Sequence, residues 1–364
     1  MRITFLLPRY PWQPSGGYAV VYRYADLLVA RGHEVRVLHP RRLPPGGWPA
    51  PSGLRGRLRR GAGALRDLAF RPRAEWAKPD PRVLMLHVPE LSRHTVPDGD
   101  AVIATWWSTA EAVLALPPSK GRRYHLIQGF ESWHGSEERI AAVWRAPLHK
   151  IVIARWLVER GRELGVPDSL MTHIPIAIPG DVFRTTAPVE RRPPRVAMLH
   201  ARTPFKGAAT GLEIMERARD RVPELEAILF GTEPPPRLPA WVRYVRRATP
   251  QHLAEAVYNR SAVYLCASMS EGWHLPPAEA MACGCALVSS DIGGVRDYAI
   301  HGRTALLYPP GDAAAGAAQL TAVLTDPELR ISLAARGREM IGAFSWSRSV
   351  AALEELLGSG TSAV

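Results

Sequence analysis

Short apolar segments alternate with longer amphipathic segments along the chain, which predicts strands that alternate with helices. In the first half, strands are expected at 3–7, 35–38, 83–87, 101–105, 124–127 and 151–154. Helices are expected between them at 17–30, 109–116, 137–144 and 155–164. Gly32 follows the first helix, where a glycine commonly ends a helix. This alternation favours a parallel, doubly wound sheet.

The same alternation begins again after a linker-like segment, 176–194, that is rich in proline and arginine. Strands are expected at 196–200, 227–230, 262–266 and 286–289, and helices at 208–218 and 250–259, with a last helix from about Ser345. Two such halves without an obvious repeat predict two Rossmann-like domains. Ligands of open α/β sheets bind at the carboxyl ends of the strands, so we expect a site in a cleft between the halves.

The alternation fails between Pro40 and Pro81, in an insertion dominated by proline, glycine and arginine. Within residues 54–70, four leucines would share one face of a helix that arginines surround. Such a helix would lie on a membrane surface or bind a lipid acceptor. An ordinary surface helix or a loop is the alternative, because Gly61 and Gly63 weaken any helix here.

The composition is that of a globular protein of 364 residues, with 46% hydrophobic and 22% charged residues. This length accommodates two ordinary domains. No apolar run reaches the ~18 residues that span a bilayer, and the apolar start is too short for a signal peptide. Cys266, Cys283 and Cys285 are the three cysteines, a sparse set that predicts a reducing cytoplasm and lacks the spacing of a zinc site.

The net charge of +12 favours anionic partners, namely nucleotides, phosphates or an acidic membrane surface. Nucleic acid is an alternative partner for a basic chain. The sequence contains no recognised nucleic-acid-binding module, so nucleic acid is not an expected partner.

The strongest chemical signal is the segment SEGWHLPPAEAMACG at residues 270–284. Glu271 lies in a polar turn, and Glu279 is expected in the first turn of a short helix that Pro277 opens and Gly284 ends. The free backbone N–H groups of a helix start bind anions. Ionised carboxylates accept hydrogen bonds from sugar hydroxyls. Together these features predict a nucleotide-sugar site.

Two loops between a strand and a helix add to this prediction. Arg202 and Lys206 follow the strand at 196–200, where cations meet a diphosphate. Gly16 and Gly17 follow the first strand, and glycines let the backbone approach a ligand closely. The alternatives are two solvated surface cations and an ordinary turn.

The sequence EGWHLP followed by EAMACG resembles the E-x7-E region of family 4 glycosyltransferases. The resemblance covers nearly the whole chain and is strongest from Arg195 to Asp312. It implies an α/β GT-B fold: two facing Rossmann-like domains, a deep interdomain cleft and a C-terminal crossover helix. The acceptor-side domain would be residues 1–180, the nucleotide-sugar-binding domain 181–344, and the helix returning to the first domain 345–364.

The resemblance also implies roles. Glu271 would contact the donor sugar, Glu279 would hold the ribose hydroxyls, and Lys206 and Arg202 would clamp the diphosphate. Backbone N–H groups of Trp273, His274 and Leu275 would bind sugar and phosphate. The family usually has glycine at the position of His274, so this imidazole either selects a sugar or points aside. Other donor-binding residues would be Gly16, Gly17, Gly231, Thr232, Arg247 and Ala248.

Residues that follow strands of the first domain are candidates for contacts with the acceptor or the sugar. These are Trp106, Gln128, Glu131 and His134. Core packing is the alternative for Trp106 and for its neighbour Trp107. A histidine of this domain often contacts the donor sugar in the family, and the sequence does not choose between His87, His125 and His134.

The resemblance therefore implies a metal-independent, retaining glycosyltransferase of the hexosyltransferase class with no cofactor. Its donor would be a nucleotide-diphosphate sugar. Its acceptor would be a hydroxyl of a glycan, a lipid-linked glycan or a natural product, which fits polysaccharide biosynthesis in the cytoplasm. Peripheral contact with the inner face of the membrane through 54–70 is a further expectation. The alternatives are a catalytically silent GT-B protein that binds nucleotide-sugar or polysaccharide, a membrane-surface scaffold and a GT-B epimerase.

Overall fold

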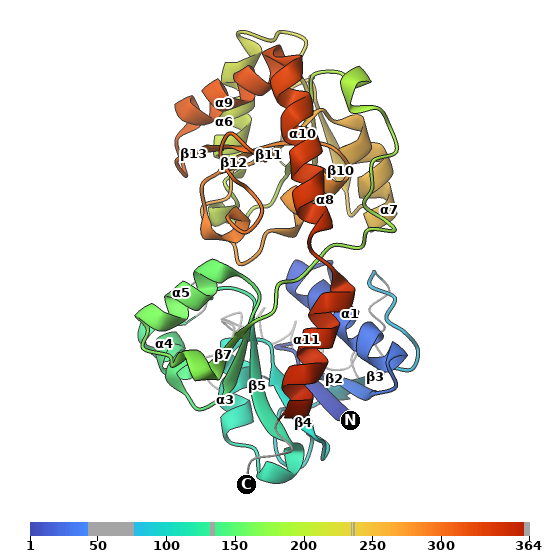
Figure 1. Ribbon diagram of the computed structural model, residues 1–364, viewed down its shortest axis with the longest axis vertical. Helices are drawn as coiled ribbons and strands as arrows, with labels where there is room; N and C mark the ends of the chain where they lie inside the picture. Colours follow the sequence, from blue (N-terminus) through green and yellow to red (C-terminus); the bar gives the residue numbers. More distant parts are fainter. Residues whose placement is uncertain (43–75, 132–134, 234, 236, 360–364) are drawn as a thin grey trace, which may run out of the picture. The chain divides into compact units, whose positions relative to one another are not determined.

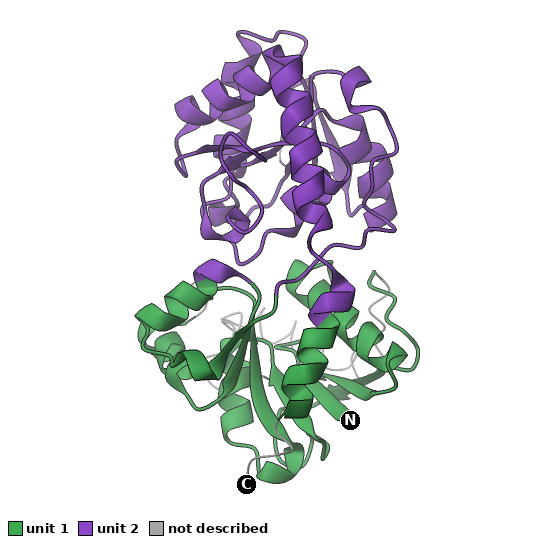
Figure 2. Ribbon diagram, viewed as in Figure 1, with its two compact units in different colours: residues 1–153, 157–174, 350–364 green, residues 154–156, 175–349 purple. Residues whose placement is uncertain are grey.

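The computed structural model describes residues 1–42, 76–131, 135–233, 235 and 237–359 (Figure 1). The expected helix at 54–70 and His134 lie outside the described residues. The chain divides into two compact units (Figure 2). Unit 1 contains residues 1–153, 157–174 and 350–364, and unit 2 contains 154–156 and 175–349.

Unit 1 is built on a parallel sheet with the strand order β3-β2-β1-β4-β5-β6-β7. The strands are β1 (Arg2–Leu6), β2 (Glu34–Pro40), β3 (Leu84–Val88), β4 (Ala101–Ala104), β5 (Arg122–Ile127), β6 (His149–Val152) and β7 (Met171–His173). The first six confirm the pattern of apolar segments. The sequence did not predict β7, whose three residues are too few to form a pattern and only half-buried.

The helices of this part of the chain also follow the pattern. They are α1 (Gly16–Ala30), α3 (Trp107–Leu114), α4 (Glu137–Arg145) and α5 (Arg155–Glu163). Gly32 ends α1 with a φ of 88°, as the sequence predicted. The last helix, α11 (Trp346–Gly358), carries Glu354, which pairs with Arg31 and with His33 of unit 1. These ion pairs join residues 350–359 to the N-terminal part of unit 1.

Unit 2 has a second parallel sheet, with the order β10-β9-β8-β11-β12-β13. Its strands are β8 (Arg195–Leu199), β9 (Glu226–Gly231), β10 (Val242–Arg246), β11 (Val263–Cys266), β12 (Ala286–Ser290) and β13 (Leu306–Tyr308). The sequence did not predict β10 or β13. Both are edge strands, and an edge strand has a neighbour on one side only, so its sequence shows a weaker pattern of apolar residues.

The helices of unit 2 are α6 (Ala208–Arg219), α7 (Pro250–His252), α8 (Leu275–Ala282), α9 (Ala313–Thr325) and α10 (Pro327–Gly342). The single helix expected at 250–259 is wrong in detail: after α7, a π-helical turn covers Leu253–Val257 and a 3₁₀ turn covers Tyr258–Arg260. The sequence pattern did not predict α9 or α10. Each begins at an aspartate cap, Asp312 or Asp326, whose carboxylate accepts a first-turn N–H.

Each sheet reverses its strand order at one point, and this point positions the candidate residues. In unit 2 the reversal lies between β8 and β11, so the chain leaves these neighbouring strands toward opposite faces of the sheet. A crevice opens at the carboxyl ends of two such strands, which is where ligands of open α/β sheets bind. Lys206 follows β8 and Glu271 follows β11.

In the part of the chain that the structure describes, no helix has the length and apolar content needed to cross a membrane.

Candidate functional site

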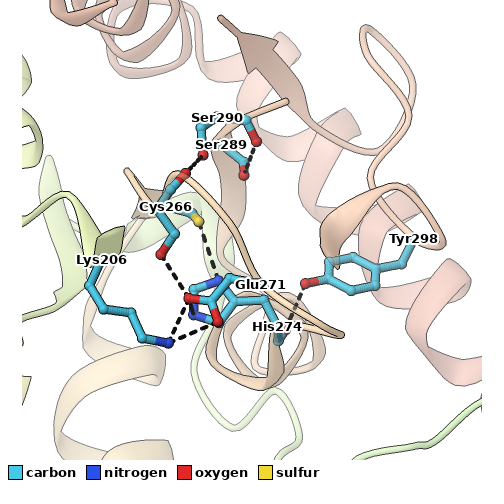
Figure 3. Close-up of polar contacts among 8 residues, drawn as sticks. Lys206, Cys266, Glu271, His274, Ser289, Ser290 and Tyr298 are labelled. Carbon is cyan, nitrogen blue, oxygen red and sulfur yellow. Dashed lines mark hydrogen bonds and ion pairs between the residues drawn. The ribbon is translucent and has the colours of Figure 1, made fainter. Parts of the chain in front are cut away.

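Lys206 and Glu271 meet at the strand-order reversal of unit 2. The Lys206 Nζ lies 2.7 Å from Oε1 and 2.8 Å from Oε2 of Glu271 (Figure 3). The side chains are 22% and 11% exposed, so the ion pair is largely withdrawn from water. The structure therefore brings together the cation and the carboxylate that the sequence placed in separate loops.

Gly207 explains how the two loops come so close. Its φ is 63°, and a Cβ on it would lie 1.9 Å from the carbonyl oxygen of Ala267. Only glycine permits this approach with this backbone conformation. The Met269 N–H also donates to the Phe205 carbonyl at 2.7 Å. The loop after β8 and the loop after β11 are therefore fastened to each other beside the ion pair.

Glu271 is held as an ionised carboxylate. The Ser268 hydroxyl donates to its Oε1 at 2.9 Å, and the His274 Nε2 lies 3.3 Å from the same oxygen. Burial alone would raise the pKa of Glu271, but the electrostatic interactions with His274 and Lys206 and the hydrogen bonds from Lys206 and Ser268 bring this pKa below its usual value. The carboxylate is therefore a hydrogen-bond acceptor.

His274 turns into the protein, and its backbone amide is already occupied. The side chain is 4% exposed, and Nδ1 lies 3.3 Å from the Cys266 Sγ (Figure 3). The His274 N–H donates to the Gly294 carbonyl at 2.9 Å, and its carbonyl accepts the Tyr298 hydroxyl at 2.6 Å. The expectation that the His274 N–H would bind sugar or phosphate stays a prediction, and such binding would require this N–H to leave the Gly294 carbonyl.

The start of α8 differs from the sequence prediction. The helix begins at Leu275, two residues before Pro277, so Glu279 is its fifth residue and lies beyond the first turn. Pro276 and Pro277 carry no N–H. The amide available for an anion in the first turn is therefore that of Leu275. The helix ends as predicted, with Gly284 at a φ of 87°.

Trp273 packs in the core of unit 2. It is 5% exposed, and its ring lies edge-on to Tyr298 and Phe344, with centroids 5.0 and 5.5 Å apart. Its indole ring is therefore structural, and a donor contact would have to come from its backbone.

Glu279 is half-buried beside Tyr258. The Tyr258 hydroxyl donates to Oε2 of Glu279 at 2.9 Å. Burial raises the pKa of Glu279 to about 7, against the opposing effects of this hydrogen bond and of His274. The sequence pattern did not single out Tyr258, because it lies within the helix expected at 250–259 and no motif marks it as a ligand contact.

Arg202 does not join the Lys206–Glu271 pair. Its guanidinium pairs with Glu233 at 3.1 Å, and its side chain is 68% exposed. The expected two-cation clamp is thus absent from the structure as it stands. Arg202 lies on the surface above the end of β8, with a competing carboxylate beside it.

The residues expected near the nucleotide base gather at the ends of β9 and β10. The Arg247 N–H donates to the Gly231 carbonyl at 2.8 Å, and the Arg246 Nε donates to the Thr232 carbonyl at 3.4 Å. Arg247 has a φ of 51°, which non-glycine residues adopt at a cost. Ala248 follows it, half-buried. Strained residues of this kind cluster at ligand-binding sites.

In unit 1, the strand ends meet the starts of α1 and α3. Gly16 and Gly17 open α1, and the Gln128 amide after β5 lies 3.5 Å from the place of a Cβ on Gly17. Glu131 is buried, and its Oε2 accepts the Trp107 N–H at 3.0 Å. Burial raises the pKa of Glu131 far above its usual value.

Glu131 thus holds the start of α3, whereas Gln128 lies half-exposed beside the glycines. Trp106 is half-buried and precedes α3, and Trp107 is fully buried in the core.

Two of the three competing histidines lie within the described part of unit 1. His125 is 3% exposed within β5, so its ring is enclosed by the core. His87 stacks on His39 with ring centroids 5.3 Å apart, and the Tyr22 hydroxyl lies 2.9 Å from the His39 Nε2. The sequence pattern did not mark His39 or Tyr22 as functional residues, because each lies within an apolar strand or helix.

Comparison with known proteins finds similarity to glycosyltransferases. The family described as "Glycosyl transferases group 1" matches residues 238–340. This region includes Glu271 and Glu279. Phosphatidyl-myo-inositol mannosyltransferase of Mycolicibacterium smegmatis is 28% identical over 95% of this chain and 91% of its own length. The protein of the same name from Mycobacterium tuberculosis is 27% identical over 95% and 94%.

Solved structures match both units together. Sucrose-phosphate synthase of Thermosynechococcus elongatus superposes with a TM-score of 0.70 at 19% identity, covering 98% of each chain. TarM of S. aureus gives 0.72 at 9% identity over 98% of each chain. HepE of Anabaena in complex with UDP gives 0.72 at 15% identity, over 99% of this chain and 100% of HepE. The chain has the GT-B fold.

The GT-B fold confirms the predicted fold class and two Rossmann-like units. Among the described residues, no three His, Cys, Asp or Glu side chains form a group that could hold a metal ion.

Proposed function

We propose that this GT-B protein is a retaining glycosyltransferase of family 4, with the E-x7-E motif at Glu271 and Glu279. It would move a sugar from a nucleotide-diphosphate donor to a hydroxyl of a glycan, a lipid-linked glycan or a natural product. The observation that carries the proposal is the Lys206–Glu271 pair at the strand-order reversal of unit 2. Similarity to glycosyltransferases over most of the chain supports it.

Lys206 is the proposed diphosphate ligand. A cation in a partly dehydrated crevice stabilises the negative charge that develops on a leaving diphosphate, which is often the largest catalytic contribution. In the ligand-free protein, Glu271 satisfies this cation. Diphosphate binding would transfer Lys206 from Glu271 to the phosphate oxygens and free the carboxylate for the sugar hydroxyls. The N–H group of Leu275 would add the positive end of α8.

Glu279 is the proposed ribose ligand. Its Oε2 is fixed by Tyr258, and its other oxygen would accept hydrogen bonds from the two ribose hydroxyls. The base would lie at the ends of β9 and β10, near Gly231 and Arg247, where the backbone is already strained. The spacing of eight residues between Glu271 and Glu279 suits a ligand with a sugar at each end of a diphosphate.

The proposed reaction forms and breaks bonds on one face of the sugar. The bond between the anomeric carbon and the diphosphate oxygen breaks, and the acceptor oxygen bonds to the same carbon from the same face. The acceptor proton passes to the leaving phosphate, so the configuration is retained. Lys206 and the Leu275 N–H at the start of α8 supply the positive charge for this step, and we propose that it uses neither a metal nor another cofactor.

The acceptor side is assigned to unit 1. Gln128 and the α1 glycines form the half-exposed part of the candidate site there, so we propose that they meet the acceptor. Two relatives are named as mannosyltransferases of phosphatidyl-myo-inositol. A lipid-linked polyol is therefore the first acceptor class to test, at the cytoplasmic face of the membrane.

A thermal-shift screen tests the proposal. UDP, GDP and ADP and their common sugars would be added to the full chain, and a ligand at one hundred times its dissociation constant adds ~2.7 kcal/mol of stability. The donor found in this way would then be incubated with polyol, glycan and phosphoinositide acceptors, and NMR of the product would report the anomeric configuration. Stabilisation by no nucleotide would contradict the proposal, and binding without transfer or donor hydrolysis would favour a catalytically silent protein.

A further inference from the structure

Cys266 and His274 form a buried polar pair directly behind Glu271. The Cys266 Sγ lies 3.3 Å from the His274 Nδ1, and the two residues are 2% and 4% exposed. Figure 3 shows the imidazole between the cysteine and the carboxylate. Neither side chain reaches the surface, so this pair can act on a ligand only through its neighbours, and Oε1 of Glu271 lies 3.3 Å from the imidazole.

The neighbours of the imidazole determine which nitrogen carries a proton. Nε2 lies 3.3 Å from Oε1 of Glu271, a carboxylate that Lys206 keeps ionised. An unprotonated Nε2 would set its lone pair against the negative oxygen, so the proton belongs on Nε2. Nδ1 then either accepts the Cys266 thiol hydrogen or, in an imidazolium–thiolate pair, donates to the sulfur. In both states, the Nε2 proton lies near Oε1 of Glu271 without the geometry of a hydrogen bond, so its interaction with this oxygen is electrostatic.

The two oxygens of Glu271 have different surroundings. Oε1 has Lys206 Nζ at 2.7 Å, Ser268 Oγ at 2.9 Å and His274 Nε2 at 3.3 Å. Among the described residues, Oε2 accepts a hydrogen bond from the Lys206 Nζ, at 2.8 Å. When Lys206 moves to a diphosphate, Oε1 keeps two neighbours and Oε2 becomes open.

We propose that Cys266 and His274 are positioning residues for Glu271. Cys266 holds His274 in the form with a proton on Nε2, and the electrostatic attraction between this N–H and Oε1 keeps Oε2 directed at the donor sugar after Lys206 has left. The inference rests on the proposed function for the identity of the ligand.

The main chain of His274 fixes the ring independently of its side-chain contacts. Its N–H and carbonyl are bound by Gly294 and Tyr298. A substitution at position 274 therefore leaves the path of the loop in place and removes the contacts of the ring alone. The ionisable groups that face the ring from surrounding elements are Cys266 from β11, Glu271 from the loop and Glu279 from α8.

The first test compares His274→Gln with His274→Leu. The glutamine amide offers an N–H at the place of Nε2, whereas leucine fills a similar volume without a donor. With the donor sugar nucleotide found in the thermal-shift screen, we expect kcat to fall roughly tenfold in H274L and to stay within about threefold of wild type in H274Q. Binding of the free nucleoside diphosphate should change by less than about twofold in both variants. Unchanged kcat in a folded H274L protein would overturn the inference.

The second test uses the cysteine. Serine at position 266 can donate to Nδ1, whereas alanine cannot, so C266S should keep more of kcat than C266A. Cys285→Ala is the matched control, because Cys285 is also buried in unit 2 and its Sγ donates to the Tyr258 carbonyl at 3.1 Å. An equal loss in C266S, C266A and C285A would indicate a packing effect and overturn the role of Cys266.

The third test needs no ligand. Nitrogen-15 NMR of the imidazoles, with the His274 signals identified by their loss in H274Q, reports which ring nitrogen is protonated. We expect a proton on Nε2 of His274 in the wild-type chain. A neutral ring protonated on Nδ1 alone would overturn the inference even if nucleotide-sugars bind. A proton on Nε2 in a chain that binds no nucleotide would overturn the proposed function instead.

Discussion

The Tyr258 hydroxyl donates a hydrogen bond to Oε2 of Glu279 over 2.9 Å, inside unit 2. Burial raises the pKa of this carboxyl to about 7, whereas in an unfolded chain the pKa of a glutamate is ~4.3. The folded state therefore holds a proton that the unfolded state has lost over this interval. The contribution of Glu279 to stability is most favourable below the unfolded pKa and declines as the pH rises through about 7.

Glu279→Gln should therefore stabilise the free protein at high pH. The glutamine is neutral, keeps an acceptor for Tyr258 and does not lose a proton. We expect the variant to gain about 1–2 kcal/mol over wild type at about pH 8 and almost nothing at about pH 5, measured by urea unfolding. Glu213→Gln is the control, because Glu213 lies on the exposed face of α6 in a pair with Arg217. A gain independent of pH would contradict the raised pKa.

The same carboxyl should make nucleotide binding depend on pH. Ribose hydroxyls donate to an ionised carboxylate, so the affinity of the wild-type chain for its nucleoside diphosphate should rise severalfold as the pH passes through about 7. The β-phosphate of the ligand also titrates near neutral pH, so E279Q provides the baseline. Calorimetric titrations that give parallel pH profiles for wild type and E279Q would exclude Glu279 as a ribose contact.

Lys206 and Glu271 should respond to substitution in opposite directions. In the free protein Glu271 occupies Lys206, so a diphosphate competes with this carboxylate. Glu271→Gln removes the competing charge, and the nucleoside diphosphate should bind a few-fold tighter while sugar transfer falls by roughly a hundredfold or more. Lys206→Met should weaken diphosphate binding at least roughly tenfold, because charge-assisted hydrogen bonds are lost. Calorimetry and transfer rates measure both effects, and tighter diphosphate binding by K206M would contradict the assignment.

Arg202 should matter much less than Lys206. Its guanidinium is 68% exposed and already pairs with Glu233, and exposed ion pairs contribute only ~0–1 kcal/mol. Arg202→Ala should change the affinity for the nucleoside diphosphate by less than about threefold at physiological salt, in the same titrations. A loss as large as that of K206M would show that Arg202 leaves Glu233 for the ligand, as the family resemblance implies.

The meeting of Lys206 and Glu271 was predictable because both follow neighbouring strands of a parallel sheet, and carboxyl ends of such strands share one edge. The direction of His274 was not, because the pattern places it in a loop and only the buried Cys266 Sγ and the Gly294 carbonyl turn it inward. Arg202 failed to join the clamp because Glu233, over thirty residues away, supplies its partner. Pairing of this kind depends on tertiary contacts that no local pattern encodes.

The helices and strands also differ in how far the local sequence pattern predicted them. Central strands such as β1 and β11 are buried along their length, and the apolar segments predicted them. The strand β10 has only its first residue buried, and β13 has three residues, so neither produced a signal. The π-helical turn at Leu253–Val257 has the same apolar spacing as an α-helix to within one residue, which explains why one helix was expected there.

Gly207 gives the sharpest test of how the fold builds the site. A Cβ at this position would lie 1.9 Å from the Ala267 carbonyl oxygen, and its φ of 63° disfavours any other residue. Gly207→Ala should therefore cost about 2–4 kcal/mol of unfolding free energy, from the steric clash together with the backbone strain. Gly302→Ala is the matched control, because Gly302 has a φ of 69° and nothing within 4 Å of the place of its Cβ.

The control Gly302→Ala isolates the effect of backbone strain, which we expect to lower the unfolding free energy by about 1 kcal/mol. The difference between the two variants measures the clash that the fastened loops impose. Because relief of the clash requires the β8 loop to move away from β11, the folded fraction of G207A should also lose diphosphate affinity, whereas G302A should keep it. Equal destabilisation in both variants, with unchanged binding, would mean that the close approach of Gly207 to Ala267 does not hold Lys206 beside Glu271.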